Sequence, residues 1–256
     1  MTDEALPPIE PPRRLHFGWI LPAIFQPRPT FNKIAIYEHG AWLTPILLLT
    51  VFALIRILIS NPLQIVALQS APFTPPPGFE TMSPEQQQQA MQASTQFGSV
   101  QVYAQNTFNL LGIWIGWLVT FGLLHLTLTL LGGRGSTRST MNIVAWASLP
   151  YLIREVVRIG YMVIAQKIIV SPGLSGFAPT AGMLGPFIGA LLGQIDLYLL
   201  WYILLIILGV TVSDKLSRAK ALGGVLFTTL LMMFLQAVPS LLGALLTGVA
   251  SGGSSF

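Results

Sequence analysis

The chain lacks cysteine and carries little charge. Without cysteine it can form no disulfide, no thiol nucleophile and no cysteine-ligated metal site. Only 9% of its 256 residues are charged, whereas a soluble domain usually has about 25%. A soluble surface needs charged side chains, but a surface that faces lipid must lack them. With 53% hydrophobic residues and a mean hydropathy of +0.69, the composition predicts a membrane protein.

Strong catalytic and cofactor motifs are also missing. The Gly-rich segment 132–137 lacks the lysine and the preceding strand of a phosphate-binding loop, and no His-Glu-x-x-His sequence occurs. Segment 173–176 (GLSG) faintly resembles the nucleophile segment of a rhomboid-type protease. That chemistry needs a histidine base within reach, and His125 is predicted near the opposite membrane face. We therefore expect no enzyme, no cofactor and no metal. The net charge of +4 does not predict nucleic-acid binding, because the basic residues flank apolar runs and form no patch.

Five long apolar runs fill most of the chain. A transmembrane helix needs roughly 20 apolar residues to cross about 30 Å of hydrocarbon, and each run is long enough. Backbone groups in lipid must be satisfied within their own segment, so each run should be helical. The predicted spans are 41–67, 107–131, 140–168, 187–212 and 221–248. The expected fold is all-α, a polytopic membrane protein in which residues 41–248 form one five-helix domain.

Positive charges fall only in alternate gaps between these runs. The N-terminal region and the gaps after the second and fourth runs carry Lys or Arg, whereas 69–106 and 171–186 carry neither. Because cytoplasmic loops are enriched in Lys and Arg, we expect the N-terminus in the cytoplasm and the C-terminus outside. An odd number of spans requires the same arrangement.

The remaining segments are short. Residues 1–16 are Pro-rich and polar, which predicts a disordered cytoplasmic tail, and residues 249–256 would form an outer tail. Residues 17–40 mix aromatic and charged side chains. This mixture favours a segment that lies in the membrane interface over an ordinary connector. Thr30 is a candidate N-cap for a short helix that begins at Phe31.

The first outer loop, 69–106, is the longest polar stretch. Ser83, Pro84 and Gln86 fit an N-cap, a proline in the first turn and a capping-box glutamine. We expect a helix from Pro84 that continues into the second span, with a bend near Gly98. The alternative is a flexible low-complexity loop.

Five charged residues are predicted inside the membrane, where a charge is costly and therefore suggests a function: Arg56, Arg154, Glu155, Arg158 and Asp196. One hypothesis is a polar cavity, open to the outer side, that is lined by the three arginines and Asp196. With Glu155 its net charge would be +1, which suits an anionic group. The alternative is a set of buried ion pairs that fix helix register, Asp196 with Arg154 or Arg56 and Glu155 with Arg158. Arg158 could also extend to the outer headgroups.

Small residues recur at four-residue spacing in three spans and predict faces where helices approach closely. These residues are Gly112, Gly116, Gly185, Gly189, Gly193, Ser240, Ala244 and Gly248. Packing within the chain is the simpler explanation, and homo-oligomerisation is the alternative. Pro150 lies inside the third span and removes one helix hydrogen bond, which predicts a kink. Ser148 could then bond to a freed carbonyl.

Several stretches resemble the Ypt-interacting-protein (Yip) family of five-span membrane proteins. They are 27–34 (PRPTFNKI), 131–137 (LGGRGST), 147–151 (ASLPY), 196–201 (DLYLLW) and 216–221 (LSRAKA). The resemblance covers about 27–230. It implies an all-helical membrane protein without enzymatic activity, and it supplies no catalytic residues. Eukaryotic members bind small GTPases, and some bacterial relatives accompany ABC-type exporters.

Two functions follow as hypotheses. The first is a non-enzymatic scaffold or accessory protein in the bacterial plasma membrane, whose partners would be the lipid bilayer, spans of a protein such as an ABC exporter, or a second copy of the chain. The second is a transporter or channel for a small anion that uses the intramembrane charges.

Overall fold

The computed structural model describes residues 15–37, 39–70, 73, 75, 78–179, 182 and 184–252, and all regular structure in these ranges is helical. Nine α-helices occur in them: α1 (Ile20–Phe25), α2 (Pro27–Ile36), α3 (Leu43–Ser70), α4 (Pro84–Leu130), α5 (Thr137–Ala147), α6 (Leu149–Ala165), α7 (Gly185–Leu192), α8 (Leu197–Ser213) and α9 (Arg218–Gly252). The all-α prediction is therefore confirmed. Most of the predicted tail 1–16, and residues 253–256 of the predicted tail 249–256, lie outside the described residues.

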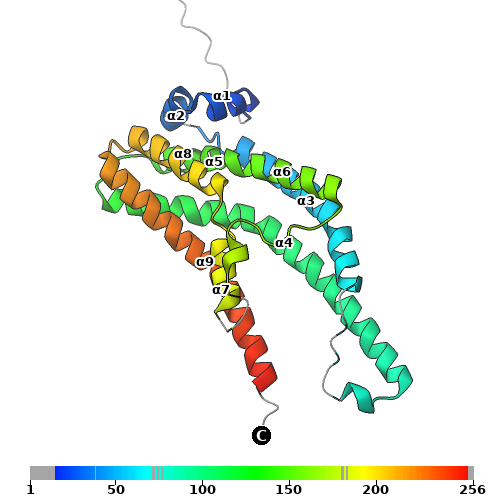
Figure 1. Cartoon of the computed structure of the whole chain (residues 1–256). Coiled ribbons are helices and arrows are strands. Elements are labelled where there is room, and N and C mark those ends of the chain that lie inside the picture. Colours follow the sequence, from blue (N-terminus) through cyan, green and yellow to red (C-terminus); the bar gives the residue numbers. More distant parts are fainter. Residues whose placement is uncertain are drawn as a thin grey trace, which may run out of the picture.

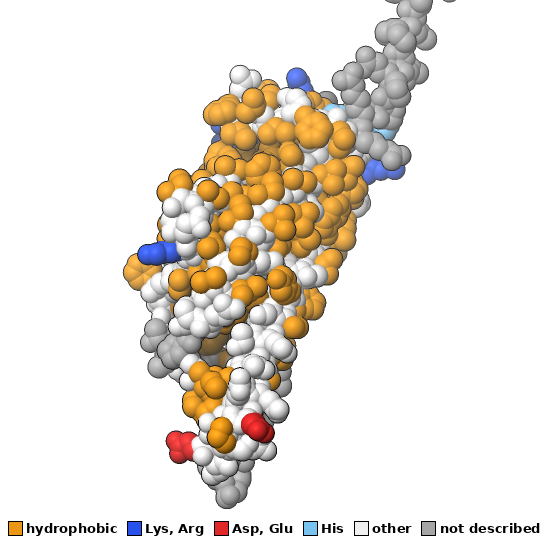
Figure 2. Space-filling view, turned by 90° about the vertical axis from the view of Figure 1, so that its right-hand side faces the viewer, with side chains coloured by type: hydrophobic (Ala, Val, Ile, Leu, Met, Phe, Trp, Pro, Cys, Tyr) orange, Lys and Arg blue, Asp and Glu red, His pale blue; other side chains and the backbone are white. Residues whose placement is uncertain are grey.

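The arrangement of the long helices is that of a membrane protein. α3, α4 and α9 are each long and apolar enough to cross a bilayer, and α7 with α8 passes the same test as one bent span. Figure 2 shows hydrophobic side chains over the middle of one face, with acidic side chains gathered at the lower tip. In the part of the chain that is described, α5 and α6 do not meet this length, so the count of five spans stays a prediction.

α4 is the longest helix and confirms the predicted helix start at Pro84. The Ser83 hydroxyl accepts from the backbone N–H of Gln86 at 3.3 Å, and the Gln86 side chain accepts from the N–H of Ser83 at 3.0 Å, which completes a capping box. The helix continues through Gly98 for 47 residues, about 70 Å at 1.5 Å per residue. Because the hydrocarbon core is only about 30 Å thick, α4 extends well beyond it. In Figure 1, α4 runs down and away from the other helices.

The predicted span 140–168 is not one helix. The chain leaves the α-helix at Ser148, which separates α5 from α6, and Pro150 lies in the first turn of α6. A proline in the first turn costs no intrahelical bond, because the N–H that it lacks would have no partner there. The Ser148 hydroxyl donates to the carbonyl of Ala145 at 2.6 Å. The interruption that proline was expected to cause therefore lies two residues before it.

The predicted span 187–212 is also interrupted. α7 and α8 meet at 59°, and residues 193–196 form the break between them. A break at membrane depth exposes backbone groups that must find partners within the protein. Asp196 is such a partner. It is the N-cap of α8, and its Oδ1 accepts a hydrogen bond from the N–H of Leu199 at 2.8 Å. Gln194 fixes the break to α9 by donating to the carbonyl of Met233 at 3.1 Å.

The segment 17–40 covers one end of the bundle. α1 and α2 lie together above the other helices in Figure 1, and α2 packs on α8 and α5. Phe31 and Ile34 are fully buried there. The packing is tight at Gly209 of α8, where a Cβ atom would lie 2.6 Å from the Ile143 side chain and 3.0 Å from that of Phe31.

The opposite side of the same segment is apolar and open. Phe17, Leu21 and Phe25 are 57%, 66% and 76% exposed. Its placement in the membrane interface stays a prediction that these side chains favour. The predicted helix start at Thr30 is wrong. α2 begins at Pro27, which is pre-organised for a first helical turn, and the Thr30 hydroxyl donates back to the carbonyl of Gln26 at 2.9 Å.

The buried amide of Asn142 on α5 holds the non-helical residues that lead into α3. Its Oδ1 accepts from the N–H of Ala41 at 2.9 Å, and its Nδ2 donates to the carbonyl of His39 at 3.0 Å. Trp146, one turn further along α5, donates its indole N–H to the carbonyl of Ala41 at 3.0 Å. Two side chains of one helix face thus satisfy both backbone groups of the buried Ala41 and bind the carbonyl of His39.

Replacing Asn142 with leucine should lower stability markedly. The change leaves the buried N–H of Ala41 without its partner, at about 1–3 kcal/mol, and also removes the bond to the carbonyl of the exposed His39. Thermal unfolding of the full chain in detergent measures the loss. Asn109→Leu is the matched control, because Asn109 is exposed on α4 and its side chain bonds only to Gln105 among the described residues. Equal loss of stability in the two variants would contradict the role assigned to Asn142.

Candidate functional site

The five predicted intramembrane charges come from three places in the fold. Arg56 lies on α3, while Arg154, Glu155 and Arg158 lie on α6, which packs against α3 and α8. Asp196 lies at the break before α8. The structure brings them together as two separate groups rather than one cluster.

The first group is centred on Glu155, which is 7% exposed. Its Oε2 accepts from the Nε of Arg56 at 2.5 Å, and its Oε1 lies 3.6 Å from a terminal nitrogen of Arg158. The pairing of Glu155 with Arg158, expected from their three-residue spacing, is present. Arg56 pairs with Glu155 and not with Asp196. One carboxylate therefore serves two guanidinium groups, and the group has a net charge of +1.

The second group joins α6 to the break before α8. A terminal nitrogen of Arg154 donates to Oδ2 of Asp196 at 3.3 Å, which is one of the two pairings that the sequence left open. The guanidinium carbon of Arg154 also lies 4.5 Å from the centre of the Tyr151 ring. Because Oδ1 of Asp196 also caps α8, this carboxylate is both the N-cap of that helix and the counter-ion of Arg154.

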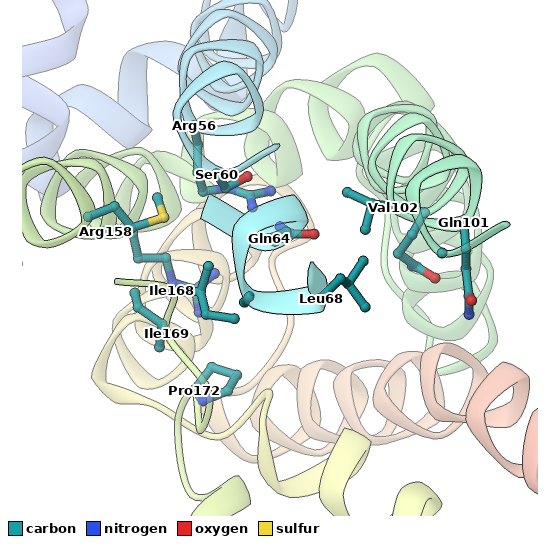
Figure 3. A pocket seen from close by; sticks show the side chains of 14 residues that line it. Arg56, Ser60, Gln64, Leu68, Gln101, Val102, Arg158, Ile168, Ile169 and Pro172 are labelled. Carbon is teal, nitrogen blue, oxygen red and sulfur yellow. The ribbon is translucent and has the colours of Figure 1, made fainter. Parts of the chain in front are cut away.

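A cavity of about 640 Å³ opens beside the first group. In Figure 3, side chains from α3, α4 and α6 surround it, together with those of the loop after α6. Its lining residues are Arg56, Ser60, Gln64, Ala67, Leu68, Gly98, Gln101, Val102, Gln105, Arg158, Met162, Ile168, Ile169 and Pro172. The cavity thus has two guanidinium groups and several amides on otherwise apolar walls.

The predicted cavity lining is therefore partly wrong. Arg56 and Arg158 line the cavity, but Arg154 and Asp196 do not. Arg154 and Asp196 are held together in the contact between α6 and α8. Each guanidinium has five N–H donors, and Glu155 engages only some of those on the two lining arginines. The cavity is therefore suited to an anionic group on a partly apolar molecule.

Sequence reasoning missed the uncharged polar residues of this cavity. Arg56, Ser60 and Gln64 follow one another at four-residue spacing on α3, and Gln101 and Gln105 do so on α4. Such spacing places side chains on one helix face. The signal was present in the sequence, although nothing there showed that the two faces meet.

The small-residue faces have three different environments. A Cβ atom on Gly185 would lie 2.7 Å from the carbonyl oxygen of Pro179, and Cβ atoms on Gly189 and Gly193 would touch the segment 175–178 at 3.6 Å. These glycines pack within the chain. By contrast, nothing among the described residues lies within 4 Å of a Cβ atom built on Gly112 or Gly116.

On α9, the hydroxyl of Ser240 donates to the carbonyl of Ala237 at 2.6 Å, and Ser240 and Ala244 are half-buried. Gly248 lies in the final turns of α9, where only the backbone is described.

The residues considered for protease chemistry are engaged elsewhere. Both ring nitrogens of His125 lie near hydroxyls of α5, at 3.2 Å from Thr140 and 3.1 Å from Thr137. The hydroxyl of Ser175 donates to the carbonyl of Pro172 at 2.7 Å. His125 therefore joins α4 to α5. Among the described residues, no group of three or more His, Asp or Glu side chains could hold a metal ion.

Comparison with known proteins gives one informative match. The model of the Yip1 domain matches residues 23–249, which include every predicted span, both charged groups and the cavity. No curated protein and no solved structure matches the chain significantly. The all-helical fold, the long apolar helices and this match agree with the resemblance found in the sequence motifs. The chain is therefore a multi-pass membrane protein that belongs to the Yip family.

Proposed function

We propose that this protein is a non-enzymatic scaffold or accessory subunit of the bacterial plasma membrane, and that it binds the spans of a partner through α4. Its N-terminus would lie in the cytoplasm and its C-terminus outside, as the distribution of Lys and Arg favours. The partner we propose is the membrane part of an ABC-type exporter.

The observation that carries this proposal is the open side of α4. Only 11% of the residues in its most apolar stretch are buried, against 33% for α3 and α9. Gly112 and Gly116 lie one turn apart with open space in front of them. Phe108 and Ile115 flank them and are 69% and 58% exposed. Without a hydrophobic force between helices in lipid, close packing at small residues is what joins spans.

The electrostatics of the interior also support a structural role. The five intramembrane charges form ion pairs with one another, and the Arg154–Asp196 pair completes a helix cap. Paired charges of this kind fix the contacts of α6 with α3 and α8. This arrangement holds the bundle in one shape, which a scaffold requires.

Replacing both Gly112 and Gly116 with leucine should abolish partner binding without harming the fold. The leucines would enter open space, so thermal unfolding should be unchanged, while the partner helix could no longer approach. Co-purification of an exporter permease with the tagged chain measures the effect. Gly122→Leu is the matched control, because Gly122 is equally open and lies on a different side of α4. Retention of the permease by the double variant would refute the proposal.

The same surface can be tested for pairing between two copies. The chain has no cysteine, so a single Gly112→Cys variant places one thiol on this face. Disulfide-linked dimers at Gly112→Cys but not at Gly122→Cys would identify the partner as a second copy of the chain. Absence of a dimer leaves the exporter subunit as the partner to be captured.

A second candidate function is the transport of a small anion, which the Arg56–Arg158 cavity favours. Arg158→Gln removes one lining guanidinium and leaves the Arg56–Glu155 pair intact. If the protein carries chloride or inorganic phosphate in proteoliposomes, this variant should lose most of the flux. Wild-type protein that carries neither anion would exclude this function for them.

A further inference from the structure

A second pocket, of about 370 Å³, lies where α4 and α8 end and α5 and α9 begin. It is formed by two loops, one at 131–136 and one at 214–217. Its lining residues are Gly132, Arg134, Asp214, Lys215, Leu216, Ser217 and Lys220. The distribution of Lys and Arg assigns this end of the bundle to the cytoplasmic surface of the membrane.

Asp214 holds the two loops together and is 3% exposed. Its Oδ1 accepts from the N–H of Gly135 at 3.0 Å, and its backbone carbonyl accepts from the N–H of Arg134 at 3.3 Å. A Cβ atom on Gly135 would lie 2.5 Å from this carboxylate oxygen, so the first loop can approach only because it has glycine there. The Ser213 hydroxyl also donates to the carboxylate. The negative charge of Asp214 is thus used inside the protein.

The cations of the pocket are arranged around this fixed centre. Lys220 joins α9 to the end of α4 by donating its ammonium group to the carbonyl of Leu131 at 2.9 Å. Lys215 has a left-handed backbone with φ of +52°, which a side chain other than glycine rarely adopts. Arg134 and Lys215 are both exposed, and neither side chain holds the loops together as Asp214 does. With Lys220 the pocket has three positive groups and one negative group, a net charge of +2.

We propose that this pocket binds a phosphate group, either in the headgroup of an anionic phospholipid or as inorganic phosphate. Phosphate oxygens accept charge-assisted hydrogen bonds from guanidinium and ammonium groups. Basic pockets between spans at the cytoplasmic surface are suited to anionic headgroups. The pocket is concave and is built by two loops that a buried carboxylate fixes. The exposed Arg134 and Lys215 line it and can donate to a ligand. The phosphate site does not depend on the proposed scaffold function. It depends on the proposed orientation only because that orientation places the pocket at the inner leaflet.

Isothermal titration calorimetry on the detergent-purified full chain tests this site with three probes: short-chain phosphatidylglycerol, inorganic phosphate and short-chain phosphatidylcholine. The variants are Arg134→Gln and Lys215→Asn, the second because asparagine tolerates a left-handed backbone. Each removed charge should weaken binding about fivefold and the double variant about 25-fold, since a basic residue near an anionic surface contributes roughly 1 kcal/mol. Thermal unfolding without ligand should not change.

Arg28→Gln is the matched control, because it removes an exposed cation on α2, outside the pocket. It should bind all three probes as the wild type does. If only phosphatidylglycerol binds in a way that depends on these charges, the ligand is a lipid. If only inorganic phosphate does so, the ligand is a soluble anion. The proposal is overturned if the double variant binds both anions as tightly as the wild type. It is also overturned if Arg28→Gln weakens binding equally, or if phosphatidylcholine binds as well as phosphatidylglycerol.

Discussion

Replacing Glu155 with glutamine should unfold the protein or come close to it. Glu155 is the carboxylate shared by Arg56 and Arg158, and the change leaves two guanidinium groups in the membrane without a counter-charge. Removing one partner of a buried ion pair typically costs about 3–5 kcal/mol. A typical protein has only about 5–15 kcal/mol of total stability. The measurement is thermal unfolding of the full chain in detergent, together with the fraction that elutes as a single species.

Arg158→Gln is the matched control for this prediction. It removes one cation and leaves Arg56 with Glu155 as a neutral pair. The expected cost is that of one partly exposed ion pair, about 0–1 kcal/mol. The two variants alter the same ion-pair group by one charge each, in opposite directions. If they lowered the unfolding temperature equally, the stabilising role of the shared carboxylate would be wrong.

Replacing Asp196 with alanine should have the second large effect, because this side chain has two tasks. Loss of the N-cap of α8 costs about 0.5–2 kcal/mol, and the uncompensated charge of Arg154 adds about 3–5 kcal/mol. Asp196→Asn separates the two tasks, since asparagine is as good an N-cap as aspartate but carries no charge. Unfolding temperatures in detergent should fall in the order wild type, Asp196→Asn, Asp196→Ala.

A double variant, Asp196→Asn with Arg154→Gln, provides the decisive comparison. It keeps the cap and removes both charges, so it should recover much of the stability that Asp196→Asn alone loses. The coupling between the two sites is then measured by a thermodynamic cycle. A double variant whose loss of stability equals the sum of the two single losses would show that Arg154 and Asp196 act on the fold independently.

The helical fold and its membrane character could be predicted because they depend on composition and on local patterns. Nine per cent charge and long apolar runs require lipid as solvent. The capping box at Ser83 is a local signal of four residues, and the helix begins where the signal places it. The helices therefore begin and end within a few residues of most of the predicted boundaries, while the count of five spans stays a prediction.

Pro150 predicted an interruption of the third span, although two residues away from where it lies, whereas the break in the fourth span was not predicted. Ser148 and the residues 193–196 lie within apolar sequence, and hydropathy does not distinguish a continuous helix from a broken one. Asp196 carried a usable signal, because an aspartate followed by an apolar run is a typical N-cap. Its position inside a hydrophobic run suggested a buried charge instead, and the capping role was missed.

The partners within the charged groups depended on contacts between helices. All five intramembrane charges lie within predicted spans, so a shared cavity or ion pairs between spans were the hypotheses. This correctly indicated that the charges could meet. It could not show that α3 packs against α6 in a register that brings Arg56 to Glu155, since hydropathy carries no information on which helices touch.

The bonds from Asn142 to the residues before α3 have a consequence for biogenesis. They connect parts of the chain 101 to 105 residues apart. A ribosome delivers the first hydrophobic segment to the membrane long before it makes residue 142, so the peptide groups near Ala41 have no intramolecular partner at that time. Insertion of the first segment and its final seating are therefore separate events, and the nascent chain completes its amino-terminal region only after α5 has emerged.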